Sequence, residues 1–469
     1  MQSLRKAIPV CAAVALAVVT GCATYRAQPL VAEESAAAFD RRTLDDPGLR
    51  SFIARSHPDP SGLRAWDLAT LTLAALYFSP DLDVARAKWQ VTRASVLAAA
   101  QIPNPSIQFS VGYVRNAPSG DSPHTRDLGI DIPIETAGKR GYRTTRAESL
   151  SDAARFDIRN VAWQSRSGVR ARLLDWGAAQ ARAAILAKNV KVQESIASML
   201  ARRLALGAAS SPEENQARIA LAQDRVDLAN ALRQADQAKS RLAAAVGVPA
   251  AALDRIDVSV DPFDRPHPRV DYAILRRDAV LNRADLLAAL SDYAASEAAL
   301  RLEIAKQYPD VHLGAAYSYD MGTNKFVLGL SGVTLPVFNR NEGPIAEAKA
   351  RRGEVAARFE ALQAKVIGEV DQAARAQESG RTQLALAASL VQAQRTQLRK
   401  LQRTFDAGET DRLSLALATH ALHAAELVHA DATAQAWQAV GQLEDAAQRP
   451  LVGELGDIDA EVDPRGRRP

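Results

Sequence analysis

The sequence predicts a mainly α-helical protein in which each chain also adds four β-strands to a membrane barrel. Three observations lead to this prediction. No proline occurs in residues 134–211 or 345–449, and both stretches are rich in alanine, which favours long helices. Large apolar residues alternate with small or polar ones in two segments, 106–135 and 310–337, so that each segment predicts a β-hairpin. The chain also contains two similar halves.

The internal repeat is visible at a constant offset along the chain. The matching pairs are Asp81 and Asp285, Leu82 and Leu286, Pro105 and Pro309, Ile107 and Val311, and Tyr113 and Tyr317. The period is far too long for a solenoid, so it predicts two large halves, 66–262 and 263–450. Each half is expected to contain a helix, a hairpin, a very long helix, a break and a return helix.

Each of the four predicted strands places its apolar side chains on one face. They are Ile107, Phe109, Val111 and Tyr113; Leu128, Ile130, Ile132 and Ile134; Val311, Leu313, Ala315, Tyr317 and Tyr319; and Phe326, Leu328 and Leu330. From Val333 onward the apolar residues change parity, which predicts a β-bulge. Strands of about 10–12 residues can cross a bilayer when they are tilted.

Four strands are too few to close a barrel, and a membrane barrel tolerates no free edges. We therefore expect three chains to close a twelve-stranded barrel in a trimer. A half-buried sheet on a soluble domain would show the same alternation, but it would leave the edges of two separated hairpins unpaired.

The long helices carry apolar stripes typical of coiled coils. The expected seam residues are Ala183, Ala187, Val190, Ala197, Ala201 and Leu204 in the first half, Leu384, Ala387, Val391, Gln394, Leu398, Leu401 and Phe405 in the second, and Leu228, Leu232, Ala235, Leu242 and Val246 in the first return helix. A helix of about 70 residues would reach about 100 Å and must pack along its length to be stable.

The N-terminus has the features of a bacterial lipoprotein signal. A basic start precedes an apolar stretch that is too short to span a bilayer, and residues 19–22 (VTGC) fit the lipobox. We expect a signal peptide over 1–21, a lipid on Cys22 and delivery to the outer membrane of a Gram-negative bacterium. An ordinary secretory signal cut near this point is the alternative. Residues 22–65 and 451–469 are interpreted as polar extensions without an assigned function.

The composition excludes several classes of protein. The 469-residue chain has a formal net charge of only +4 with both signs interleaved, so nucleic-acid binding is not expected. Both cysteines lie in the first 22 residues, which excludes a disulfide framework in the body of the protein. No phosphate-binding loop, nucleophile elbow or pair of catalytic carboxylates occurs in a suitable context, so we expect no enzyme.

Several stretches resemble the outer membrane efflux protein (TolC) family, and within it the CzcC- and CusC-type lipoprotein factors of RND efflux systems. They are NRADLLAAL (282–290), QYPDVHLGAAYS (307–318), TLPVFNRNEGPIAEAKA (334–350), ALGAASSPEENQARIAL (205–221) and FDAGETDRLSLALATH (405–420). The similarity runs from about residue 66 to 450 and includes both halves.

The resemblance implies a homotrimer whose barrel lies in the outer membrane and continues into a long α-helical tunnel through the periplasm. It further implies that the tunnel docks on a periplasmic adaptor linked to an inner-membrane RND pump, and that the protein is a passive duct for metal ions or small toxic compounds. The alternative is a lipid-anchored, coiled-coil structural lipoprotein of the envelope without channel activity.

The two helix breaks would then be the periplasmic tips of the tunnel, which contact the adaptor in this family. The residues expected there are Gly207, Ser210, Ser211 and Pro212 in the first break and Gly408, Thr410 and Leu413 in the second. In the best-known family member, acidic side chains just beyond these turns constrict the pore. Counted from the tip glycines, Glu213 matches such a position, whereas Ser414 and Leu417 occupy the second-half equivalents. Glu213, Asp411 and Arg412 are the gate candidates, and solvated tip charges are the alternative.

One histidine-rich segment has to be weighed as a metal site. His420, His423 and His429 lie close together with Glu426 between them, and His420 and His423 are neighbours on a helix. No further Cys or His cluster completes a site, and histidines on a polar helix more often face solvent or line a pore. We therefore expect no metal site and no cofactor. A soluble enzyme using this cluster would show metal-dependent activity and no membrane fractionation.

Overall fold

The computed structural model describes residues 23–56, 65–260, 263, 268 and 270–451. The chain divides into two compact units, Met1–Arg42 and Thr43–Pro469. In the first unit the described part contains helix α2 (Ala32–Asp40), in which no residue is buried. The elements discussed below belong to the second unit.

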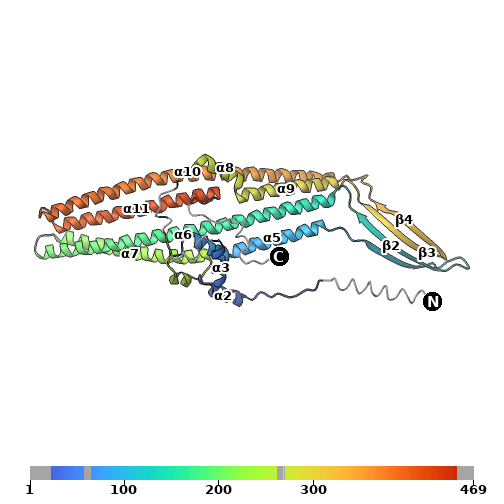
Figure 1. Ribbon diagram of the computed structural model, residues 1–469, viewed down its shortest axis with the longest axis horizontal. Coiled ribbons are helices and arrows are strands. Elements are labelled where there is room, and N and C mark those ends of the chain that lie inside the picture. Colours follow the sequence, from blue (N-terminus) through green and yellow to red (C-terminus); the bar gives the residue numbers. More distant parts are fainter. Residues whose placement is uncertain (1–22, 57–64, 261–262, 264–267, 269, 452–469) are drawn as a thin grey trace. The chain divides into compact units, whose positions relative to one another are not determined.

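The second unit runs through one series of elements twice (Figure 1). The first series comprises α4 (Leu68–Phe78), α5 (Pro80–Ala100), β1 (Ser106–Tyr113), β2 (His124–Ile134), α6 (Lys139–Ala205) and α7 (Ser211–Val246). The second comprises α8 (Tyr272–Asn282), α9 (Ala284–Ala305), β3 (Val311–Asp320), β4 (Thr323–Val333), α10 (Glu342–Asp406) and α11 (Arg412–Ala447). The predicted repeat and both hairpins are confirmed. β1 has 8 residues and is shorter than predicted.

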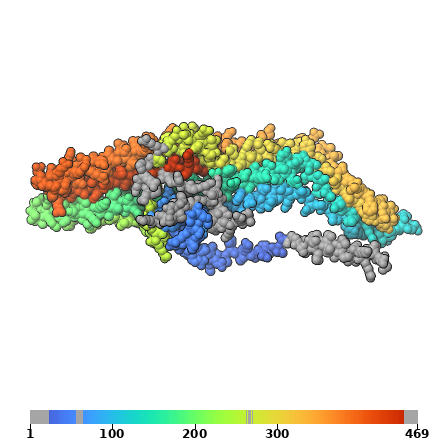
Figure 2. Space-filling view, viewed as in Figure 1, coloured from blue at the N-terminus to red at the C-terminus, as the bar shows by residue number. Residues whose placement is uncertain are grey.

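Four long helices pack side by side at the end of the unit away from the strands. α6 has 67 residues and α10 has 65, and each is followed by a return helix of 36 residues. α6 packs against α7, α10 packs against α11, and α11 also packs against α6. Figure 2 shows the orange-to-red surface of α10 and α11 beside the green surface of α6 and α7. At 1.5 Å per residue, α6 alone is about 100 Å long.

The seam residues predicted for α6 and α10 are all buried or half-buried, so both stripes are confirmed. On α7 one prediction is wrong, because the side chain of Leu232 is 56% exposed. Its neighbour Ala231 is 2% exposed and packs against Ala183 and Leu186 of α6. The small side chain occupies the seam because it allows the two backbones to approach closely.

The two hairpins form one antiparallel sheet in the order β1-β2-β3-β4. β2 and β3 pair with each other, with Leu128 opposite Tyr317 and Ile130 opposite Ala315. The inner edges of the hairpins are therefore joined within the chain, and only β1 and β4 form edges of this sheet.

The predicted bulge is confirmed and lies in β4. Leu313 pairs with Leu330, whereas His312 pairs with Gly332, so that Ser331 is the extra residue. The extra residue returns Val333, which pairs with Val311, to the face that carries Leu330. Leu335 and Val337 continue the parity of Val333 but lie beyond the end of the strand.

The largest apolar core lies around α4. It includes side chains from the segment before α4, where α3 (Pro47–Ser56) packs against it. Leu44, Leu49, Phe52 and Ile53 are at most 3% exposed and join Leu71 of α4 and Leu242 of α7 in one cluster. This part of 22–65 is therefore not a polar extension as interpreted from the sequence. It completes the core of the first half.

A buried ion-pair cluster joins α6 to the end of α11. Glu444, which is fully buried, lies 3.0 Å from Arg166 and 2.6 Å from Arg170 through its Oε2 atom. Leu451 also donates its backbone N–H to Oε1 of Glu444 at 2.6 Å. Gly441 leaves room for this arrangement, because a Cβ atom there would lie 2.6 Å from the guanidinium carbon of Arg170.

Candidate channel site

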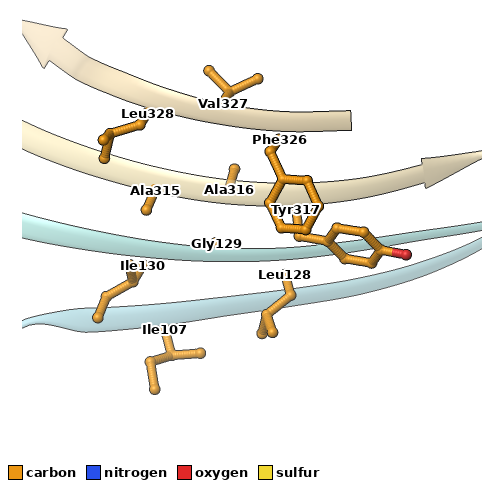
Figure 3. A pocket seen from close by; sticks show the side chains of 10 residues that line it. All are labelled: Ile107, Leu128, Gly129, Ile130, Ala315, Ala316, Tyr317, Phe326, Val327 and Leu328. Atoms are coloured by element: carbon orange, nitrogen blue, oxygen red, sulfur yellow. The ribbon is translucent and has the colours of Figure 1, made fainter. Parts of the chain in front are cut away.

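One face of the sheet is apolar and exposed. Two cross-strand rows on it are Ile107, Ile130, Ala315 and Leu328, and Phe109, Leu128, Tyr317 and Phe326. Leu328 is 86% exposed and Phe326 is 82% exposed. Figure 3 shows side chains of these rows around a shallow groove on the sheet. A large apolar surface of this kind marks contact with lipid or with another protein.

The opposite face of the sheet is polar. Ser110 of β1 donates a hydrogen bond to Asp127 of β2 at 2.9 Å. Further along β2, Asp131 lies 2.9 Å from Nδ1 of His312 and also accepts a hydrogen bond from Ser331. Ser331 is the bulge residue and directly follows Leu330 of the apolar face, so its hydroxyl lies on the polar face. One apolar face and one polar face are the pattern of a strand between lipid and a water-filled barrel interior.

Polar contacts fix the junction between the sheet and the helices. Asp310 accepts hydrogen bonds from the backbone N–H of Thr136 at 2.9 Å and from Nζ of Lys139 at 2.7 Å. Lys139 also donates to the backbone oxygen of Tyr308 at 2.6 Å. In the second half, Asn341 adopts φ +62° just before α10 and donates to the backbone oxygen of Glu303. The first three contacts hold the segment before β3 to the start of α6 in the other half, and the last holds the start of α10 to the end of α9.

At the other end of the unit, the α6–α7 turn is built from two helix caps. Gly207 has φ +71°, and the N–H of Ala208 reaches back to the oxygen of Arg203 at 2.7 Å, as in a Schellman motif. Ser210 then begins α7 by a capping box with Glu213, and a proline follows in the first turn.

The α10–α11 turn also has a left-handed glycine and a Schellman-type hydrogen bond. Gly408 has φ +78°, and the N–H of Glu409 donates to the oxygen of Thr404 at 2.9 Å. Asp411 caps α11 by accepting the N–H of Ser414 at 2.8 Å. Glycine suits this position because the left-handed region of φ is unfavourable for other residues.

An ion pair connects the two turns. Nη2 of Arg203, in the last turn of α6, lies 2.5 Å from Oδ2 of Asp411 at the start of α11. Arg203 and the N–H of Ser414 together lower the pKa of Asp411 to about 2. Asp411 is therefore charged at every physiological pH, and the ion pair joins the first half of the chain to the second.

The three predicted gate residues lie in different settings. Asp411 connects the two turns, as described. Glu213 accepts hydrogen bonds from the backbone N–H and the hydroxyl of Ser210, which lower its pKa. Arg412 is exposed. Arg203 is not among the residues predicted from the sequence. Its position could have indicated it, because it is a basic residue in the last turn of a helix, four residues before the tip glycine.

The residues predicted to contact an adaptor all lie in the two turns or in the first turn of the helix that follows. Those that are exposed are Gly207, Ser210, Ser211, Pro212 and Gly408, and those that are half-buried are Thr410 and Leu413. Leu413 packs against a cluster that contains Ile196 and Ala217. Contact with an adaptor stays a prediction for all seven.

The histidines of α11 face different neighbours. Nε2 of His420 lies 3.1 Å from Nδ2 of Asn189 on α6 and 3.5 Å from Oδ2 of Asp224 on α7. Burial lowers the pKa of His423. Among the described residues, no group of three or more His, Cys, Asp or Glu side chains is placed to hold a metal ion. Asn189 and Asp224 are far from His420 in the chain, so their position beside it could not be predicted from the sequence.

Two observations concern the lipidation site and the helices. Cys22, the predicted lipidation site, lies outside them. Within them, no helix has both the length and the apolar character needed to cross a membrane.

A sheet with one exposed apolar face, joined to paired long helices, defines the class of outer membrane channel subunits. The model of the family described as outer membrane efflux protein matches residues 72–248 and 275–447, which is most of the chain. The protein therefore belongs to the outer membrane efflux protein family.

Two characterised relatives are similar in sequence. The cobalt-zinc-cadmium resistance protein CzcC of Cupriavidus metallidurans is 28% identical over 284 residues, which is 60% of this chain and 65% of CzcC. The pyoverdine export outer membrane protein OpmQ of Pseudomonas aeruginosa is 26% identical over 351 residues, 68% of this chain and 72% of OpmQ. The match to CzcC thus spans slightly less than two thirds of that relative.

Solved structures share the fold. The outer-membrane channel OprN has a TM-score of 0.67 at 18% identity, with 92% of this chain and 99% of OprN covered. VceC from Vibrio cholerae has a TM-score of 0.66 at 19% identity, with 82% and 96% covered. CusC has a TM-score of 0.66 at 18% identity, with 82% and 92% covered. The predicted fold, mainly α-helical with four strands per chain, is confirmed.

Proposed function

We propose that this protein is the outer membrane duct of a tripartite, RND-type efflux system. Three chains form a twelve-stranded barrel, and their long helices continue it as a tunnel into the periplasm. The protein itself supplies no energy and no catalytic group. The inner-membrane pump drives transport, and a periplasmic adaptor joins the pump to the tunnel.

The sheet is the observation that carries this proposal. Its apolar face is exposed on every strand, its other face is polar, and β1 and β4 are open edges. Backbone groups at an open edge cannot stay unpaired in lipid, so β1 of one chain has to pair with β4 of another. A monomer leaves this requirement unmet, and a closed trimer meets it.

The cargo and the adaptor are proposed on different grounds. CzcC is named for resistance to cobalt, zinc and cadmium, and OpmQ for pyoverdine export, so metal ions and small organic compounds are both candidate cargoes. The adaptor is proposed to bind the two turns, where Pro212 and Gly408 are exposed.

Planar-bilayer recording on the purified protein tests the duct. We expect a detergent-resistant trimer that migrates more slowly in gels than the monomer it releases on heating, and discrete conductance steps in the bilayer. A folded monomer without conductance would contradict the duct and favour the alternative, a coiled-coil lipoprotein that acts only as a spacer. Loss of resistance in a deletion strain would then identify the cargo.

The Arg203–Asp411 ion pair is proposed to hold the periplasmic tips closed. Arg203→Ala is expected to raise single-channel conductance several-fold, because the end of α6 loses its 2.5 Å contact with α11. The matched control is Arg182→Ala, which breaks another exposed ion pair between the same helices, Arg182 with Asp431 at 2.8 Å, farther from the tips. Equal conductance in both variants and the native protein would show that Arg203 does not gate.

The anchor is proposed to be a lipid on Cys22. Cys22→Ser is expected to remove the mass of the acyl chains from the mature protein and to block labelling by radioactive palmitate. Cys11→Ser, which changes the other cysteine, is the control and should leave both readouts unchanged. Labelling that survives Cys22→Ser would rule out this site of lipidation.

A further inference from the structure

Three side chains from three helices meet where α11 packs against the first half of the chain. Nε2 of His420 lies 3.1 Å from Nδ2 of Asn189 and 3.5 Å from Oδ2 of Asp224. Nδ2 of Asn189 lies 3.3 Å from the same oxygen of Asp224. The three terminal atoms therefore form a nearly equilateral triangle.

The sides of this triangle, 3.1–3.5 Å, are close to the separations between ligands of one metal ion. Zn²⁺ binds histidine nitrogen and carboxylate oxygen at about 2.0–2.2 Å in tetrahedral geometry, which places two ligand atoms about 3.3–3.6 Å apart. A half-turn of the terminal amide of Asn189 exchanges its Nδ2 and Oδ1 atoms and brings an oxygen to the third corner. One imidazole with oxygen donors suits a divalent transition metal.

Asn189 also carries an acceptor that the fold leaves unused. The residue is 4% exposed, and its Oδ1 atom has no hydrogen-bond partner among the described residues. Buried carbonyl groups are normally satisfied, so an unpaired one needs an explanation. One turn further along α11, Nδ1 of His423 is also buried and unpaired within the described part of the chain. The half-turn of the Asn189 amide directs its unused Oδ1 atom to the third corner of the triangle.

We propose that a divalent transition-metal ion such as Zn²⁺ or Co²⁺ binds between His420, Asp224 and Asn189, with water as its fourth ligand. The side chains of His420 and Asp224 are 34% and 16% exposed, which leaves the ion and its water a path from solvent. The ion joins α11 of the second half to α6 and α7 of the first. The site depends only on the packing of these helices, and it stands whether or not the protein is a duct.

Metal titration of the purified trimer tests the site. The full-length protein carries a tag without histidine, is stripped with chelator and is titrated with Co²⁺ and then Zn²⁺. We expect one saturable site per chain, visible d–d absorption of tetrahedral Co²⁺ that Zn²⁺ removes, and a higher melting temperature with metal bound. His420→Ala and Asp224→Asn are each expected to weaken metal binding tenfold or more, because each removes one ligand of the ion.

Two matched controls and one gain-of-affinity variant complete the experiment. His429→Ala and Asp227→Asn change the same residue types on the same helices and are expected to bind like the native protein. Asn189→Asp adds a carboxylate at the third corner and is expected to tighten binding. The proposal is overturned if the native protein shows no saturable Co²⁺ site, or if the double variant His420→Ala/Asp224→Asn binds as well as the native protein.

Discussion

Glu444→Ala is expected to lower the free energy of unfolding by about 3–5 kcal/mol, because it removes the carboxylate that faces two buried guanidinium groups. Glu444 is 0% exposed, and Arg166 is 2% exposed. Removing one partner of a buried ion pair lowers the free energy of unfolding by far more than the intact pair contributes. The remaining charge stays buried, where water solvates it poorly. Urea unfolding of the detergent-solubilised protein, followed by circular dichroism, measures the effect.

The exposed pair Arg182–Asp431 provides the control. Asp431→Asn is expected to change the unfolding free energy by less than about 1 kcal/mol, because water already solvates both charges. Replacing Glu444, Arg166 and Arg170 together by apolar residues of similar size should recover most of the stability. If Glu444→Ala alone unfolds at the native urea concentration, the cluster is not a stability determinant.

The same cluster predicts how stability depends on pH. Burial alone would raise the pKa of Glu444, but the charge and hydrogen bonds of Arg166, with the charge of Arg170, lower it below its ordinary value. A carboxylate whose pKa is lower in the folded than in the unfolded state stabilises the fold at pH values above the unfolded-state pKa. That contribution is lost as the pH falls through the folded pKa. The stability difference between native and Glu444→Gln proteins should therefore shrink on acidification.

The local elements of this fold could be predicted from the sequence because they depend on neighbouring residues. The absence of proline allows α6 to continue unbroken to Ala205, and Gly207 then ends it with a left-handed turn. β4 could be predicted because Phe326 and Leu328 are two residues apart and therefore lie on the same face of a strand. The bulge at Ser331 left a visible change of parity a few residues later.

Contacts between distant segments could not be predicted in the same way. The pairing of β2 with β3 places Leu128 opposite Tyr317, and nothing near either residue specifies that register. The sequence predicts Asp411 as a gate candidate, but its partner Arg203 lies on another helix. A single sequence contains the residues of such a site without the packing that brings them together.

Leu328→Arg is expected to prevent most of the protein from entering the outer membrane. Leu328 lies near the middle of β4, pairs with Ala315 and is 86% exposed on the apolar face of the sheet. An arginine on the lipid face of a barrel near the bilayer midplane costs about 2–4 kcal/mol, and a trimer carries three of them. The measurement is the fraction of heat-modifiable trimer in isolated outer membranes.

Val327→Arg is the matched control, because adjacent strand residues point to opposite faces. Its side chain lies on the face that carries Asp127 and Asp131, which is the water-filled interior of the proposed barrel, so trimer yield should stay near the native level. The arginine would instead project into the pore and reduce its conductance to cations. Equal loss of trimer in both variants would mean that neither face lines a pore. Normal insertion of Leu328→Arg would mean that the apolar face is covered by protein. The contrast between these two neighbouring residues therefore tests which side of the sheet faces lipid.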